Sequence, residues 1–167
     1  MDKVTSYTPM IEYSIKGFAF FSSTTITLTN GQTKYVYGKV GQIKDIIMED
    51  RNVIAISVDS DIDVEVKLYE DTTITANGTP IEIYNNNRNL SDGTTFKMFS
   101  NPTISDNGTL LPRGNRLKAV KKETSNLSDR NPMILAKNKG YLIEVINNTA
   151  KTVEVRIYWS WWEEGDL

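Results

Sequence analysis

The fold is decided by the segment Tyr141-Leu-Ile-Glu-Val-Ile-Asn147, a polar turn over 148–151, and the segment Thr152-Val-Glu-Val-Arg-Ile-Tyr-Trp-Ser-Trp-Trp-Glu163. Side chains on a β-strand alternate between its two faces. One face of the second segment is therefore apolar and consists of Val153, Val155, Ile157, Trp159 and Trp161. The other face is mostly polar and consists of Thr152, Glu154, Arg156, Tyr158 and Ser160. The pattern predicts that the chain finishes as an antiparallel hairpin whose second strand fills a core.

Composition limits the chemistry that the chain can offer. Its 167 residues suffice for one sizeable domain, and we expect an N-terminal arm over 1–17 followed by a single β-sandwich domain over 18–167. The sequence has neither cysteine nor histidine, so thiolate ligands, disulfides and the commonest general base are all missing. We therefore expect no enzymatic activity, no cofactor and no metal.

Net charge and terminal sequence bear on partners and compartment. A net charge of −2 and a pI near 5.3 argue against a protein that coats nucleic acid. The first residues do not form a basic start followed by an apolar run, so no signal peptide is visible. No apolar stretch approaches the length of a membrane span. We expect a protein made in a cytoplasm that binds neither nucleic acid nor membrane.

The turns along the chain are typical of β-structure. Asn30-Gly31 separates a threonine-rich run over 24–29 from an aromatic run over 33–37, which predicts a hairpin. The runs over 53–58 and 62–69 predict a second hairpin. Shorter strands are expected near 72–75, 81–84, 95–99, 103–105 and 109–111, and one short helical turn near 41–49. This series of short strands separated by turns predicts an all-β antiparallel sandwich or jelly-roll-like fold.

One short sequence occurs twice. Thr73-Ile-Thr-Ala-Asn-Gly-Thr79 is echoed by Thr103-Ile-Ser-Asp-Asn-Gly-Thr109. Asn-Gly tolerates the positive φ that tight turns require. We interpret the echo as two hairpins that use the same turn chemistry, because two short copies do not establish a repeat architecture.

The β-pattern dissolves between Pro112 and Pro132, where we expect a long basic loop. Only Glu123 and Asp129 are acidic in this segment. Its basic residues are Arg113, Arg116, Lys118, Lys121, Lys122 and Arg130. Two interpretations stay open: a solvated surface loop, or an arm that contacts an acidic partner surface.

Acidic clusters in the sequence do not predict a metal or catalytic site. Asp59, Asp61, Asp63 and Glu70 match four positions of an EF-hand calcium loop, but Val64 stands where that loop needs glycine. We interpret these carboxylates as the wet face of a strand and its turn. The sequence also lacks a glycine-rich phosphate loop, and nothing in it pairs two carboxylates in a cleft.

The tryptophans at the end of the chain differ in direction. Alternation places Trp159 and Trp161 in the core, whereas Trp162 points outward beside Tyr158. We expect Trp162 and Tyr158 to lie at a subunit interface, where both residue types are enriched. The alternative is a sugar-binding surface, since aromatic rings offer apolar faces to sugars.

Three blocks of the sequence resemble virion proteins of tailed bacteriophages. The first, Leu68–Asn89, contains an acidic residue, a Gly-Thr turn and an Asn-x-Asn-Arg sequence in the same order. The second is Phe99–Leu111, and the third lies within Met133–Glu164 and ends in the tryptophan-rich segment. The chain departs from the resemblance in its basic segment, where such proteins tend to be glycine-rich, and in the Trp161-Trp162 doublet.

The resemblance implies a capsid decoration or auxiliary protein on the outer face of a phage head, with a β-sandwich or jelly-roll fold and no enzymatic activity. Its partners would be the major capsid protein and further copies of itself, as a dimer or trimer. It would lie on the capsid exterior after assembly in the host bacterial cytoplasm. The alternative is a glycan- or receptor-binding head-fibre or tail module.

Two sets of side chains are candidates for these roles. The predicted capsid or partner interface consists of Arg113, Arg116, Lys118, Lys121, Lys122, Tyr158 and Trp162. Glu70 and Arg88 bracket two predicted strands and a turn, so we expect them to form a charge pair that fixes the 85–89 loop against the sheet.

Overall fold

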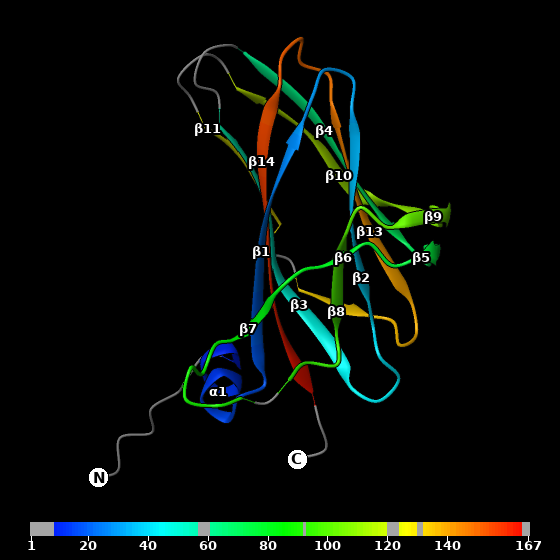
Figure 1. The fold of residues 1–167 in the computed structure, drawn as a ribbon. Helices are drawn as coiled ribbons and strands as arrows, with labels where there is room; N and C mark the ends of the chain where they lie inside the picture. The colour runs from blue at the N-terminus through cyan, green and yellow to red at the C-terminus, as the bar shows by residue number, and fades with distance from the viewer. Residues whose placement is uncertain (1–8, 57–60, 92, 120–123, 130–131, 165–167) are drawn as a thin grey trace.

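Two antiparallel sheets form the body of the protein. The computed structural model describes residues 9–56, 61–91, 93–119, 124–129 and 132–164 (Figure 1). The described residues form one helix and fourteen strands. Sheet A consists of β11 (Thr124–Asp129), β3 (Asp45–Ile56), β14 (Val153–Glu164), β1 (Ala19–Leu28) and β7 (Ile83–Asn85), with β12 (Met133–Leu135) beside β3. The predicted all-β sandwich is confirmed.

Sheet B faces sheet A, and a small two-stranded sheet C projects from it (Figure 1). Sheet B consists of β10 (Thr109–Ala119), β4 (Ile62–Glu70), β13 (Gly140–Asn147), β2 (Thr33–Lys39), β8 (Lys97–Ser100) and β6 (Thr79–Pro80). Sheet C consists of β5 (Thr73–Ala76) and β9 (Thr103–Asp106).

The predicted hairpins are wrong, because each connects strands of different sheets. β1 and β2, β3 and β4, and β13 and β14 all pass from one sheet to the other. A turn signal shows that the chain reverses, but not whether the two strands lie side by side or face to face. Face-to-face placement lets both apolar faces meet in one core. Asn147, fully buried, holds two of these crossings together by donating from its amide to Leu28 O (3.1 Å) and Lys151 O (2.8 Å).

The core contains the predicted face of β14. Trp159 and Trp161 are 1% and 0% exposed, and Val153, Val155 and Ile157 are buried with them. Phe96, just before β8, stacks on Trp159 at 5.8 Å between ring centroids and meets Trp161 edge-on at 5.1 Å. Offset and edge-to-face aromatic pairs of this kind stabilise by about 0.5–1.5 kcal/mol beyond their buried area. The alternation read from the sequence therefore gave the correct facing.

The helix lies in a different place from the predicted helical turn. The segment 41–49 is not helical, and β3 begins there at Asp45. Ile46, Ile47 and Met48 are all buried, because β3 is an inner strand between β14 and β12. A short, continuous apolar run of this kind cannot be distinguished from a buried helix by its periodicity. The single helix of the described residues, α1 (Pro9–Lys16), falls in the segment predicted to be an arm.

The predicted long basic loop is mostly strand. β10 extends to Ala119 and β11 covers Thr124–Asp129. The pairing of β10 with β4 shifts register between Leu111 and Asn115, around Pro112 and Gly114. A bulge of this kind breaks the alternation by which strands are recognised, and so hides a strand from sequence analysis.

The two copies of the repeated sequence do not form separate hairpins. They pair with each other as β5 and β9, the two strands of sheet C. The contacts are reciprocal: Thr75 Oγ1 donates to Thr103 O (3.4 Å), and Ser105 Oγ donates to Thr73 O (3.2 Å). Sheet C is thus a quasi-twofold unit made of two copies of one sequence.

The quasi-twofold relation extends into the flanking backbone. Asp71 and Asn101, at equivalent positions, both have positive φ, 64° and 51°. A Cβ on Gly78 would collide with Ser100 O, and one on Gly108 would collide with the equivalent Glu70 O. Each glycine is therefore required where one copy crosses the other closely.

Candidate functional site

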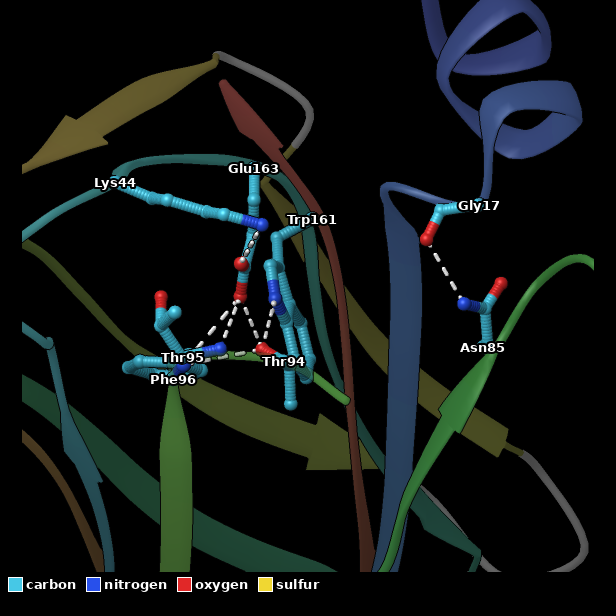
Figure 2. Close-up of polar contacts among 8 residues, drawn as sticks. All are labelled: Gly17, Lys44, Asn85, Thr94, Thr95, Phe96, Trp161 and Glu163. Carbon is cyan, nitrogen blue, oxygen red and sulfur yellow. Dashed lines mark hydrogen bonds and ion pairs between the residues drawn. The ribbon is translucent and has the colours of Figure 1, made fainter. Parts of the chain in front are cut away.

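Asparagines of the Asn-x-Asn-Arg sequence fasten the N-terminal segment to sheet A. Asn85 is buried and donates from Nδ2 to Gly17 O at 2.8 Å, as Figure 2 shows. Asn87 donates to Ile15 O (3.1 Å), and Asn86 donates to Ser14 Oγ (3.3 Å). Carbonyls in the last turn of a helix lack partners within it, so the Asn87 amide satisfies a group, Ile15 O, that α1 (Pro9–Lys16) leaves open. The motif therefore holds α1 in place.

A buried carboxylate fastens the end of β14 to the segment before β8 (Figure 2). Glu163 is 0% exposed, and its Oε1 accepts hydrogen bonds from the Thr94 hydroxyl and from the Thr95 N–H at 2.7 Å. Its Oε2 lies 3.5 Å from Lys44 Nζ. Trp161 Nε1 donates to Thr94 Oγ1 at 3.3 Å. Buried charges are tolerated when they are paired and hydrogen-bonded in this way.

Sequence reasoning missed Glu163, although the alternation that places Trp159 and Trp161 inward places Glu163 inward too. A carboxylate at an inward position is the signal that was available. Its partners are backbone amides, a hydroxyl and a lysine, which suit a structural anchor between the sheets rather than acid–base chemistry.

Half-buried aromatic rings line the outer face of sheet A, and we call them the aromatic surface: Tyr13, Phe21, Tyr84, Tyr158 and Trp162. Phe21 stacks on Tyr84 at 5.3 Å and on Tyr158 at 6.3 Å. Tyr13 of α1 stacks on Trp162 at 5.8 Å. One face of the Trp162 ring is thus already covered by the protein itself.

The predicted partners Glu70 and Arg88 lie in different parts of the sandwich. Glu70 ends β4 in sheet B, where it is paired with Thr109 and Tyr141. The Arg88 guanidinium lies over the Tyr84 ring of the aromatic surface, 5.3 Å from its centroid. The two side chains are not paired: Arg88 follows β7 to sheet A, which sequence distance alone does not reveal.

A second cluster of polar side chains surrounds the Glu144 carboxylate on the outer face of sheet B. Tyr69 and Tyr35 donate from their hydroxyls to Glu144 at 3.1 and 3.4 Å, and Lys67 Nζ lies 3.6 Å from the same carboxylate. Burial, and then the neighbouring Glu144 charge, raises the pKa of both tyrosines. Glu144 is itself 8% exposed, and Lys67 Nζ also lies 3.5 Å from Glu65, so one lysine is shared by two carboxylates in this cluster.

The predicted basic interface lies partly outside the described residues. Arg113, Arg116 and Lys118 lie on β10, at the edge of sheet B, whereas Lys121 and Lys122 fall outside the part of the chain that the structure describes. β11, which follows, forms the edge of sheet A. The basic segment therefore passes from the edge strand of one sheet to the edge strand of the other.

Two other kinds of feature are absent from the residues that the structure describes. These residues contain no group of three or more acidic side chains arranged to hold a metal ion. None of their helices is long and apolar enough to cross a membrane.

Comparison with known proteins gives only distant similarities. No family model matches the chain, and no curated protein matches it. The chain is similar to a structure of the infectious bursal disease virus Gt strain, with 12% identity over 87% of this chain and 39% of that one, at a TM-score of 0.22. A Bacillus thuringiensis Cry1Da tryptic core variant matches with 9% identity over 87% and 18%, at a TM-score of 0.20.

The chain thus spans well under half the length of these two proteins. TM-scores this low carry no argument about function.

Proposed function

We propose that this chain is a structural virion protein that decorates or stabilises the outer face of a tailed-phage head. The observation that carries the proposal is the course of the basic segment. In a chain of net charge −2, six basic residues and two acidic residues lie along 112–132. This segment contains most of β10 and all of β11. In the part of the chain that is described, each of these strands forms an edge of its sheet.

Edge strands and positive charge both suit attachment to a protein lattice. An edge strand presents backbone donors and acceptors that a partner strand can pair with. A local positive charge attracts an acidic capsid surface and fixes the orientation of docking. Lysine and arginine on an edge also hinder unwanted strand pairing, so contact with the capsid would depend on charge complementarity.

The resemblance to phage virion proteins supports the same proposal, with the major capsid protein and further copies of the chain as partners. The alternative, a glycan- or receptor-binding head-fibre or tail module that uses Trp162 and Tyr158, has less support. Tyr13 stacks on Trp162, and Phe21 stacks on Tyr158, so both rings have partners within the chain.

Capsid occupancy at increasing salt concentration tests the proposal. Phage heads assembled without this chain would be incubated with purified protein, and the bound fraction measured from about 0.05 to 1 M salt, where the Debye length falls to roughly 3 Å. We expect occupancy to fall as salt rises. The double substitution Lys121→Glu and Lys122→Glu should lower occupancy at low salt without changing the unfolding temperature.

Lys137→Glu combined with Lys151→Glu is the matched control, since both lysines are exposed and lie outside the basic segment. This control should keep parental occupancy. Occupancy that is constant across salt, and equal in the two double variants, would remove the docking role of the basic segment.

A further inference from the structure

A cavity of about 340 Å³ lies where sheet C meets the outer face of sheet B. Its lining comes from β2, β8 and the β5 region, and consists of Tyr37, Lys39, Thr72, Thr73, Ile74, Asn77, Lys97 and Phe99. Ligand pockets in proteins range upward from about 300 Å³. The cavity therefore has the size for one small ligand of the order of a monosaccharide.

Two lysines face each other in this cavity. Lys39 of β2 and Lys97 of β8 are register partners across neighbouring strands. Like charges directly opposite each other in a sheet are destabilising. Lys39 Nζ donates to Asn138 O at 2.7 Å, which is a neutral acceptor, and no acidic side chain of the described residues lines the cavity. Among the described residues, Lys97 has no ion-pair partner, so the positive charge here is uncompensated.

The quasi-twofold relation supplies an internal comparison for this lysine pair. Lys67 of β4 occupies the position equivalent to Lys97, and its register partner on β13 is Glu144. There the lysine is neutralised, with 3.6 Å between Lys67 Nζ and the carboxylate. The half of sheet B that lines the cavity has Lys39 where the other half has Glu144. Two like charges placed opposite each other without compensation weaken the fold locally, and such unfavourable arrangements are typical of functional sites.

Aromatic and amide groups complete the lining. Tyr37 and Phe99 are register partners with their ring centroids 6.5 Å apart, and they lie two residues along the strands from the lysine pair on the same face. Tyr37 is 3% exposed, and its hydroxyl has no hydrogen-bond partner among the described residues. Asn77, on the β5 side, adds an exposed amide with donors and an acceptor.

We propose that this cavity binds a sugar residue that carries a carboxylate, such as a uronic acid. The two lysine ammonium groups would bind the carboxylate, since the described lining offers two cations and no competing anion. The partly exposed Phe99 ring, beside the buried Tyr37, would pack against the apolar face of the sugar ring, and Asn77 would hydrogen-bond its hydroxyls. A small inorganic anion would use the lysines but leave the Phe99 ring and the Asn77 amide without a role.

Backbone amide shifts measured by nuclear magnetic resonance test this proposal with methyl glucuronide as the probe and neutral methyl glucoside as its matched counterpart. We expect saturable shifts at cavity residues such as Thr73, Asn77 and Phe99. The glucoside should bind up to about fivefold more weakly, the range expected for an exposed ion pair with an ammonium group.

Lys97→Gln should reduce glucuronide affinity to the level of the glucoside, while Lys151→Gln, at an exposed turn outside the cavity, should leave it unchanged. The absence of saturable shifts, shifts centred on the aromatic surface instead, equal affinity for the two sugars, or parental affinity in Lys97→Gln would each overturn the proposal. Inorganic phosphate that shifts the same amides as strongly as the glucuronide would also overturn it, because the site would then select charge alone.

Discussion

Replacement of Glu163 by alanine should cost about 2–4 kcal/mol of the free energy of unfolding. The loss has three sources in the structure. The Thr95 N–H, 2.7 Å from Oε1, would be left without an acceptor in a buried place, which costs about 1–3 kcal/mol. The Thr94 hydroxyl would lose a charge-assisted hydrogen bond. The removed Cγ methylene contributes about 0.8 kcal/mol.

Two neighbouring groups limit the loss. The Phe96 N–H keeps an acceptor, Thr94 Oγ1, at 3.0 Å. The Lys44 side chain is 26% exposed, so its ammonium can turn to solvent when the carboxylate is gone. The cost should therefore stay below that of stranding a fully buried charge.

Urea denaturation followed by tryptophan fluorescence measures the change, because Trp159 and Trp161 lie beside the anchor. Glu164→Ala is the control: Glu164 is exposed and accepts one hydrogen bond, from Tyr13 at 3.5 Å, so it should lose about 0–1 kcal/mol. Glu163→Gln keeps one acceptor oxygen and should fall between the two. Equal midpoints for Glu163→Ala and Glu164→Ala at equal m-values would refute the role of the anchor.

Three further predictions concern the core, the quasi-twofold crossing and high pH. Trp159→Ala should destabilise by about 3–5 kcal/mol, since it removes a fully buried ring that stacks on Phe96; an unchanged unfolding temperature would contradict the packing. Gly108→Ala should lower the free energy of unfolding by more than about 1 kcal/mol, because φ is +84° and the new Cβ would meet Glu70 O. Gly93→Ala is the control: with open space around it, it should change the free energy of unfolding by at most about 0.5 kcal/mol in the same urea denaturation assay. Burial raises the pKa of Tyr141 to about 12, so the unfolded phenol ionises first and stability should fall as pH rises between about 10 and 12. A tyrosine absorbance titration that shows every phenol ionising near pH 10 in the folded protein would contradict that assignment.

Local patterns predicted several of the strands and the facing of β14. The alternation over 153–161 gave the buried face of β14 correctly, because side-chain direction along a strand depends only on the backbone of that strand. The same alternation, extended by one inward position, reaches Glu163 and so pointed to the buried anchor. The Asn-Gly turn at 30–31 likewise marked a reversal of the chain, which the structure contains.

What the sequence determined alone was therefore the all-β class, the place of several strands and the inward face of β14. Pairing was decided only by the tertiary structure: β13 and β14 lie in opposite sheets, the two copies of the repeated sequence pair with each other, and Lys39 comes to face Lys97. Residues that are distant in the chain meet through the burial of several apolar faces at once, and no local segment contains that information. Periodicity is a property of one strand, whereas register and neighbours are properties of the whole core.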